Sequence, residues 1–537
     1  MRRVAIVLAF MGVALCALAQ VPAGADPVPG PVVHTRAGDV GGFVEGSVVE
    51  WRAIPYAAPP VGNLRWRPPA PAEPWDGVRL SPDFAPQCSQ LVAEAQAGGS
   101  EDCLYLNVFA PVGRQASDSL PVMVHLHGGG NLGFRPYRNA DAFVERDVIV
   151  VTLGYRLGAF GFAGHPELTE EGDGSSGEYG VLDQIAALHW VQENIAGFGG
   201  DPDNVTLFGE SAGSVDAVAI AASPLGKGLF ARLAAQSGYF FALHGRGTIA
   251  DAESLGSNIA EVVGCSDHAD VVGCLRSVPA EDIVVGAESS LGLVNGYSPW
   301  VGGQVLPKSP LELIGSDVSP VPMLVGSTRE EAAFFAAVDG VLPPGDNYPA
   351  FGRARDLNGV SGPQNGRHVR ELYPVDAYES AYWATVAVNS DAVYTCPMRR
   401  LALANRAPVY RYLYTHGYDN VPDPVTLAAK AAHFFEEPVL WHDPDLLFGL
   451  DFEFSADEEV LADRMADYWT NFAKNGNPNG PGVETWLPFT AGAENIKVLD
   501  EPAGDLIGYH KAECTFFDRV PDLYAPAQVY TPVATGH

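Results

Sequence analysis

The chain has 537 residues, of which 47% are hydrophobic and 18% charged, and its formal net charge is -33. This composition is typical of a globular protein and excludes the disordered and fibrous classes. The acidic excess argues against a nucleic-acid partner, since phosphates require a basic face.

The N-terminus has the pattern of a secretory signal peptide. Arg2 and Arg3 precede an apolar run from Val4 to about Ala19, and small-residue cleavage sites lie near residues 19 and 25. We therefore expect residues 1–25 to be a signal peptide and residues 26–537 to be a single exported domain, secreted or periplasmic. The scarcity of lysine favours a bacterial source.

Cys16, inside this apolar run, leaves a lipoprotein anchor open as an alternative, although Leu15 is bulkier than the residue that usually precedes such a cysteine. No later segment has the roughly 18 apolar residues that a membrane span needs. Stable membrane insertion is therefore not expected.

The remaining six of the seven cysteines are consistent with disulfides in an oxidising compartment. Six cysteines allow fifteen pairings, and sequence alone does not choose among them. Cys88 with Cys103 and Cys265 with Cys274 would close short loops. No C-x-x-C pair indicates a zinc site.

Short β-branched apolar runs alternate with longer helical patterns along most of the chain. Because the runs are almost entirely apolar, they predict parallel strands buried on both faces and joined by crossover helices, an α/β class with one large sheet. The runs are "PVMVHLH" (121–127), "DVIVVTLGYR" (147–156), "NVTLFGES" (204–211), "PVPMLVGS" (320–327) and "PVYRYLYTH" (408–416). Residues 180–199 carry apolar residues at helical spacing and predict one crossover helix.

The pentapeptide Gly-Glu-Ser-Ala-Gly at residues 209–213 lies between a predicted strand and the small-residue helix 212–223. A strand, a G-x-S-x-G turn and a helix form a nucleophile elbow, which exposes the serine hydroxyl. Gly209 and Gly213 would let strand and helix approach closely. Ser211 is therefore our predicted nucleophile, with a structural helix-capping serine as the alternative.

The segment "HLHGGG", residues 125–130, predicts an oxyanion hole. Acyl transfer needs backbone N–H donors for a tetrahedral oxyanion, and an HGGG-type loop supplies them together with the residue after the nucleophile. We expect Gly129, Gly130 and Ala212 to be these donors. A metal pair of His125 and His127 lacks further ligands nearby, so no metal or cofactor is expected.

An orienting acid and then a histidine should follow the serine along the chain. Glu330 and Glu331 follow a predicted strand, and either fits the acid by position. His416, His433 and His442 are the candidate bases, and spacing does not rank them.

Several segments together resemble the type B carboxylesterase family, the cholinesterase-like branch of the α/β-hydrolase fold. They occur in family order over nearly the whole mature chain. They are "IPYAAPPVGNLRWRPP" (54–69), "SEDCLYLNVFAP" (100–111), "HGGG", the block from Gly180 to Gly213, "STREEAAFF", "AAHFFEEP" and "DYWTNFAKNGNPNGPG" (467–482).

The resemblance implies that Ser211 is the nucleophile, Glu331 the triad acid and His433 the base, since Glu436 stands three residues after His433 as in the family. His416 instead matches a histidine just after the preceding strand.

The resemblance also implies three disulfides. Cys88–Cys103 and Cys265–Cys274 match two bridges of the family, and Cys396–Cys514 matches a third that some members have.

The chain departs from the family pattern at three positions near the expected site. Phe434 and Ala332 replace glycines that usually follow the histidine and the acid, so the backbone there should differ. Asn131 replaces a common aromatic residue after the glycines. The loop between Cys88 and Cys103 also lacks the tryptophan that faces choline in cholinesterases, which argues against acetylcholine as a substrate.

The implied function is a secreted serine carboxylesterase that hydrolyses small-molecule esters through an acyl-enzyme. Glu210 and Ser237 could act behind the triad, with packing or capping as the alternative for each. An amidase or carbamate hydrolase with the same triad remains a second interpretation. A non-catalytic cholinesterase-like binding protein is a third, although such proteins usually lack the serine or the histidine.

Overall fold

The computed structural model describes residues 28–93, 95–238, 247–291, 297–315, 320–338, 362–418, 420–421, 429–447, 450 and 452–519. The expected signal peptide, residues 1–25, lies outside the described residues.

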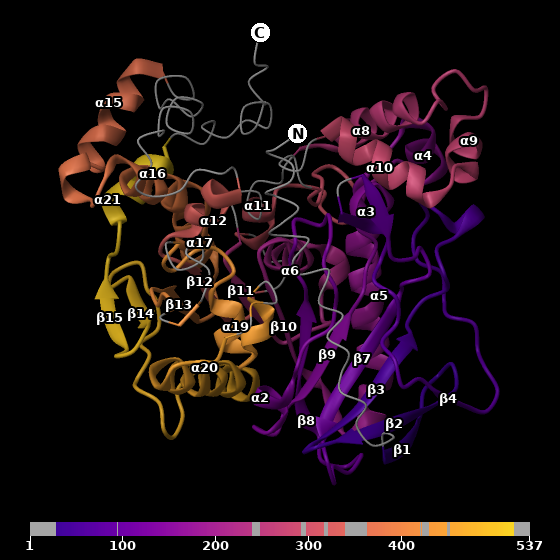
Figure 1. Ribbon diagram of the computed structural model, residues 1–537, viewed down its shortest axis with the longest axis horizontal. Helices are drawn as coiled ribbons and strands as arrows, with labels where there is room; N and C mark the ends of the chain where they lie inside the picture. Colours follow the sequence, from indigo (N-terminus) through magenta and orange to yellow (C-terminus); the bar gives the residue numbers. More distant parts are fainter. Residues whose placement is uncertain are drawn as a thin grey trace.

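One sheet of thirteen strands runs through the described part of the chain (Figure 1), and β5 and β6 pair separately. Its order is β1-β2-β3-β7-β9-β8-β10-β11-β12-β13-β14-β15, with β4 beside β2. The strands are β1 (Val28–His34), β2 (Asp39–Glu45), β3 (Val48–Pro55), β4 (Val78–Leu80), β5 (Gln90–Ala93), β6 (Gln96–Gly98), β7 (Tyr105–Pro111), β8 (Leu120–Leu126), β9 (Ile149–Leu153), β10 (Gly200–Glu210), β11 (Arg232–Gln236), β12 (Met323–Thr328), β13 (Val409–Tyr414), β14 (Asn495–Leu499) and β15 (Gly504–Ile507).

Within the central block, from β9 through β8 and β10 to β14, adjacent strands are all parallel to one another. Antiparallel pairs flank this block, with β1, β2, β3 and β7 on one side and β15 on the other. The prediction of a large, mostly parallel sheet is confirmed, and each of the five apolar runs overlaps one of its strands. The antiparallel margins were not predicted.

The helices connect and cover these strands. They are α2 (Asp141–Val144), α3 (Gly158–Phe162), α4 (Pro166–Glu171), α5 (Tyr179–Asn194), α6 (Ala212–Ala222), α8 (Ile249–Val262), α9 (Val271–Ser277), α10 (Ala280–Leu291), α11 (Pro310–Ile314), α12 (Glu331–Val338), α15 (Gly362–Leu372), α16 (Ala381–Ser390), α17 (Cys396–Ala404), α19 (Glu436–Leu440), α20 (Ala456–Asn475) and α21 (Lys511–Phe517). The predicted crossover helix is α5, which continues as the 3₁₀ turn η2 (Ile195–Phe198) and ends where Gly199 takes a φ of 86°.

Alternating side chains of the strands belong to two cores, one on each face of the sheet. Leu207 of β10 packs in the core that contains residues of α5 and α6, whereas its neighbour Phe208 packs with α2, α19 and α20. This alternation follows from strand geometry, in which successive side chains point to opposite faces. Helices therefore cover both faces, and the loops at the carboxyl ends of the parallel strands are left to form a site.

The structure contains three disulfides, and their pairing agrees with the resemblance. They are Cys88–Cys103, Cys265–Cys274 and Cys396–Cys514.

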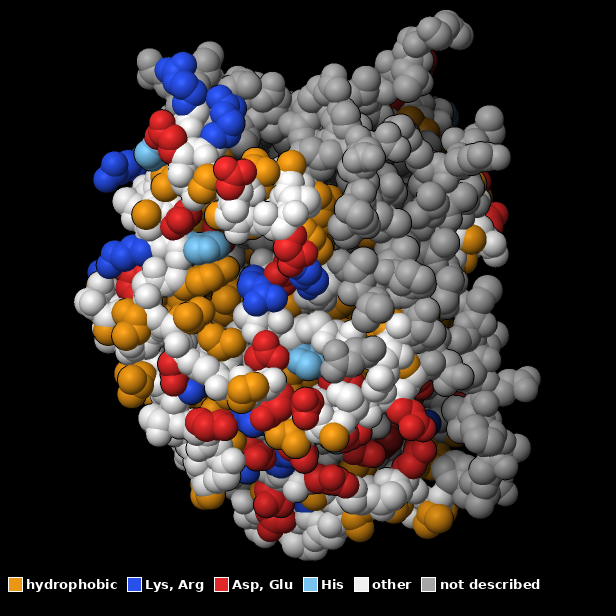
Figure 2. Space-filling model, turned by 60° about the vertical axis from the view of Figure 1, so that its left-hand side comes forward, with side chains coloured by type: hydrophobic (Ala, Val, Ile, Leu, Met, Phe, Trp, Pro, Cys, Tyr) orange, Lys and Arg blue, Asp and Glu red, His pale blue; other side chains and the backbone are white. Residues whose placement is uncertain are grey.

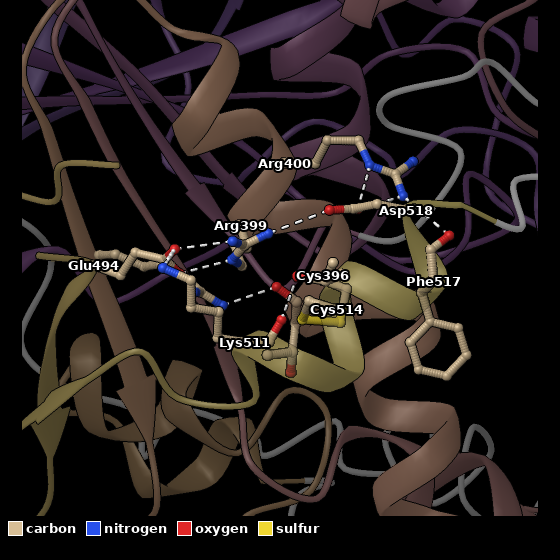
Figure 3. Close-up of polar contacts among 11 residues, drawn as sticks. Cys396, Arg399, Arg400, Glu494, Lys511, Cys514, Phe517 and Asp518 are labelled. Carbon is tan, nitrogen blue, oxygen red and sulfur yellow. Dashed lines mark hydrogen bonds and ion pairs between the residues drawn. A yellow bond between two sulfur atoms is a disulfide. The ribbon is translucent and has the colours of Figure 1, made fainter. Parts of the chain in front are cut away.

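The third disulfide ties the C-terminal helix α21 to α17, and ion pairs surround it (Figure 3). Arg399 makes two hydrogen bonds to Glu494, of 2.8 and 2.9 Å, and Arg400 pairs with Asp518 at 2.7 Å. The end of the described chain is thus held by both covalent and ionic contacts.

The acidic excess is visible on the face that carries α20. Figure 2 shows Asp and Glu side chains gathered over its lower part, and Asp457, Glu459 and Asp463 of α20 are exposed. Within the described residues, no helix combines the length and apolar character needed to cross a membrane.

Candidate active site

Ser211 stands at a sharp turn between β10 and α6. Its φ of 54° and ψ of −123° are strained values for a residue with a side chain. The backbones beside this turn approach very closely. A Cβ at Gly213 would lie 2.0 Å from the carbonyl oxygen of Leu126. Glycine is therefore required at this position, as the elbow interpretation predicted.

Ser211, His433 and Glu331 form a continuous chain of contacts. His433 Nε2 lies 2.8 Å from Ser211 Oγ, and His433 Nδ1 lies 2.5 Å from Glu331 Oε2. The other oxygen of Glu331 accepts a hydrogen bond of 2.9 Å from the backbone N–H of Thr328. All three side chains are buried, with Ser211 the most exposed at 9%. This arrangement can activate a hydroxyl as a nucleophile for acyl transfer.

The other candidate histidines lie elsewhere. His416 Nδ1 is 3.0 Å from Asp500 and its Nε2 is 3.5 Å from Glu458, whereas His442 Nε2 is 2.5 Å from Glu459. Neither is recorded in contact with Ser211.

Glu330, the other candidate acid, instead joins the loop that carries Glu331 to the loop that carries His433. Its N–H donates to the carbonyl of Ala431 at 2.9 Å, and its carboxylate accepts from the N–H of Ala431 at 3.3 Å. Its carboxylate also pairs with Arg329 at 2.6 Å. Glu330 therefore fixes the two loops against each other.

Aromatic rings surround the imidazole of His433. The ring centroids of Tyr394 and Phe335 lie 5.1 and 5.2 Å from it. Tyr394 belongs to a π-helical turn, η5 (Asp391–Thr395), between α16 and α17. Such turns are rare and occur often at functional sites.

Further buried carboxyl groups lie close to the triad. Glu210 Oε1 is 3.2 Å from His433 Nε2, and Ser237 donates a 2.7 Å hydrogen bond to Glu436. Burial raises the pKa of Glu210 well above its usual value, and the nearby carboxylate of Glu436 adds to this effect. Burial, followed by the charge of Glu331, likewise raises the pKa of Glu436. Both groups are thus favoured in their neutral, protonated forms.

The sequence reasoning missed Glu437 and Gln236. Glu437 accepts a 2.9 Å hydrogen bond from Gln236 and one of 3.0 Å from Trp441, and the carbonyl of Gln236 accepts from the N–H of Ser211 at 3.0 Å. The signal for Glu437 was its place directly after Glu436 in "HFFEEP". Gln236 ends a short strand, β11, that no pattern had indicated.

The glycine loop after β8 passes directly beside Ser211. A Cβ at Gly128 would lie 3.2 Å from that of Ser211. The next three residues, Gly129, Gly130 and Asn131, have φ values of 93°, 66° and 56°. Ala212 begins α6, where the first N–H groups have no acceptor within the helix. The loop and the helix start thus meet at the serine, where the oxyanion donors were expected.

His125 and His127 lie in the buried part of this segment. Burial lowers the pKa of His127 to about 3, which favours a neutral ring. The described residues contain no group of three or more His, Cys, Asp or Glu side chains arranged to hold a metal ion.

The departures from the family pattern have local consequences. Phe434 has a φ of 78°, a value that favours glycine, and its ring lies 5.8 Å from that of Phe134. Ala332 lies buried in the first turn of α12.

Most of the chain is similar in sequence and structure to known carboxylesterases. A model of the carboxylesterase family matches residues 29–517. The chain is 32% identical to pyrethroid hydrolase Ces2e of Rattus norvegicus over 85% of this chain and 84% of that protein. It is 33% identical to liver carboxylesterase 1 of Mus musculus over 88% of this chain and 91% of that protein. Among solved structures, a thermophilic PNB esterase aligns with a TM-score of 0.77 and 32% identity, covering 90% of this chain and 99% of that one.

Proposed function

This chain belongs to the carboxylesterase family and hydrolyses carboxylic esters, and on that premise we propose that Ser211, His433 and Glu331 perform the hydrolysis. The observation that carries the proposal is the pair of contacts on His433, 2.8 Å to the serine hydroxyl and 2.5 Å to the glutamate. A hydroxyl, an imidazole and a carboxylate in this order are the groups that acyl transfer requires.

In the proposed first half-reaction, Ser211 Oγ attacks the ester carbonyl carbon while His433 Nε2 takes the hydroxyl proton. Glu331 accepts a hydrogen bond from Nδ1–H and stabilises the imidazolium. The N–H groups of Gly129, Gly130 and Ala212 hold the oxyanion of the tetrahedral intermediate. As the intermediate collapses, His433 donates the proton to the departing alkoxide, and the acyl group stays on Ser211.

In the second half-reaction, water replaces the alcohol. His433 takes a proton from the water as its oxygen attacks the acyl carbonyl, and the second tetrahedral intermediate is held by the same donors. His433 then returns the proton to Ser211 Oγ, which frees the carboxylic acid and restores the enzyme.

Two serine variants, one at the turn before α6 and one within α6, test the assignment. Ser211→Ala should lower kcat for a p-nitrophenyl ester by at least about 10⁴-fold. Ser214→Ala is the matched control, because Ser214 is buried on α6 and its hydroxyl has no recorded partner among the described residues. Rapid hydrolysis by Ser211→Ala, or organophosphate labelling of that variant, would refute the proposal. An ester, amide and carbamate panel on the parent enzyme separates the carboxylesterase from the amidase interpretation.

We also propose that the mature protein is exported as a single domain, residues 26–537. The basic and apolar start of the chain supports this, as do the three disulfides, which are typical of oxidising compartments. N-terminal sequencing of the protein from the growth medium or periplasm tests the proposal. An intact Met1 on cytoplasmic protein would contradict it.

A further inference from the structure

A buried hydrogen bond joins the glycine loop to the helix that begins at the nucleophile. Asn131 Nδ2 donates to Asp216 Oδ1 at 3.1 Å, and both residues are fully buried. Asn131 directly follows Gly129 and Gly130, and Asp216 lies on α6. The contact therefore links the two backbone segments that would supply the oxyanion donors.

The position of Asp216 on α6 determines which face of the helix the glycine loop contacts. Asp216 is four residues after Ala212, and residues four apart lie on the same face of an α-helix. The loop is thus bound to the face of α6 at whose start Ala212 stands. A change in the Asn131–Asp216 distance would shift Gly129 and Gly130 relative to the N–H of Ala212.

From this geometry we propose that Asn131 and Asp216 are positioning residues that set the spacing of the oxyanion donors. The inference rests on the proposed function, since it assumes that Ser211 is the nucleophile. Neither residue touches the reacting atoms. Their effect would be exerted on the tetrahedral intermediate, because the stabilisation of its negative charge depends on the placement of the three N–H groups.

Every polar group of the Asn131 side chain is used in holding this position. Its Nδ2 also lies 3.3 Å from the carbonyl oxygen of Tyr297, and its Oδ1 accepts from the hydroxyl of Tyr155 at 3.0 Å. Its backbone carbonyl accepts from Gly158 N–H at 2.7 Å. Asparagine also tolerates the left-handed backbone of this loop better than most residues with side chains. The residue therefore suits both the turn and the link.

Asp216 is held by a second amide. Gln184 of α5 donates a 2.7 Å hydrogen bond to Asp216 Oδ2, while the Oε1 of Gln184 is buried without a recorded partner. Among the described residues no cation lies within ion-pair distance of Asp216, and burial raises its pKa to about 7. In Asp216→Asn, rotation of the Gln184 amide would give the new NH₂ group an acceptor. This variant should therefore preserve the link to Asn131.

The test compares binding of a trifluoromethyl ketone, which forms a tetrahedral adduct with an active-site serine, with the KM of a p-nitrophenyl ester. Asn131→Gly keeps the backbone conformation allowed and removes the link, and Asp216→Ala removes the acceptor. For both we expect kcat/KM to fall and the ketone Ki to rise by about 10- to 100-fold, with KM changed less than about threefold. Asp216→Asn should stay within about threefold of the parent.

Asn405→Gly is the matched control. The Asn405 amide donates to the carbonyls of Val321 and Ala407, which lie two residues before β12 and β13, at the ends of those strands away from Glu331. Its loss should lower the melting temperature without changing the ketone Ki. A double variant, Asn131→Gly with Asp216→Ala, should raise the ketone Ki no more than either single variant, since each of them already breaks the Asn131–Asp216 hydrogen bond.

The proposal is overturned if Asn131→Gly folds and keeps the ketone Ki within about twofold of the parent. It is also overturned if Ki and KM rise equally, because the residue would then serve binding in general. If Asp216→Ala does not fold, Asn131→Gly and Asp216→Asn decide the question. If the proposed function itself is wrong, Ser211→Ala will keep its esterase activity, and this result distinguishes the two cases.

Discussion

Glu210 Oε1 lies 3.2 Å from His433 Nε2, the nitrogen that also faces the Ser211 hydroxyl. Two oxygens therefore lie near one nitrogen. The protonation state of Glu210 decides how strongly its carboxyl group competes with Ser211 for a hydrogen bond to His433 Nε2. Burial, together with the charge of the neighbouring Glu436, raises the pKa of Glu210 and so favours its neutral form.

A neutral Glu210 can be replaced by an amide with little effect. We expect kcat/KM of Glu210→Gln to stay within about fivefold of the parent, since a carboxamide imitates the shape of a protonated carboxyl group. Glu436→Gln, which keeps an acceptor for Ser237, should behave similarly. A loss above about 100-fold in Glu210→Gln, measured with a p-nitrophenyl ester, would show that the ionised form supports the imidazolium.

Two adjacent glutamates should differ sharply in their effect on catalysis. Glu331→Gln should lower kcat by about 10⁴-fold, because an amide does not fix the imidazole tautomer or stabilise its charge. Glu330→Gln removes a carboxylate that pairs with Arg329 and Ala431 N–H instead, so kcat should fall less than about tenfold. Equal losses in the two variants, from initial rates at saturating ester, would contradict the assignment of the acid.

The stability of the protein should depend on the ionisation of His416. Burial opposes its charged form, but contacts with Asp500 and Glu458 outweigh this and raise its pKa to about 9. Because the pKa is higher in the folded than in the unfolded state, the stabilisation is complete below about pH 6.5 and is lost as the pH rises through about 9.

Thermal unfolding of His416→Asn across this range tests the prediction. The difference in melting temperature between the parent and the variant should be largest below pH 6.5 and should shrink towards pH 9. Asp500→Asn should show the same trend, because it removes the partner that accepts the hydrogen bond. A difference that does not change with pH would mean that His416 stabilises the fold by packing alone.

Removal of the third disulfide should lower stability more than removal of the second. The Cys396–Cys514 bridge spans 118 residues and the Cys265–Cys274 bridge spans nine. Loop-closure entropy then gives about 5 kcal/mol for the first and about 2.5 kcal/mol for the second. Melting temperatures of Cys→Ser pairs measure the difference.

Catalysis should survive the loss of the third disulfide at 25 °C. The ion pairs from Arg399 and Arg400 to Glu494 and Asp518 still hold the C-terminal segment. We therefore expect the variant Cys396→Ser with Cys514→Ser to keep at least about half of the parent kcat/KM, because the bridge does not itself contact the triad. An inactive but folded variant would indicate that the bridge also fixes Tyr394, two residues from Cys396, against His433.

Local signals in the sequence predicted the central block of the fold and Ser211. Glu331 and His433 were assigned only through the resemblance to the family, because position alone left other glutamates and histidines open. The parallel strands are continuous apolar runs, and the elbow needs small residues next to Ser211. The link between Asn131 and Asp216 has no such signal, since its partners are 85 residues apart and each looks like an isolated polar residue. Strand β11 was missed because "RLAAQ" is short and contains no β-branched residue.

Ser211 and His433 are separated by 222 residues, and Glu331 and His433 by 102. During synthesis, the chain therefore carries its serine long before its base has been made. Even after the base appears, β14, which pairs with β13, has still to be added. Esterase activity would thus appear only when nearly the whole chain has been assembled, and recovery of activity would report the completion of folding rather than its early steps.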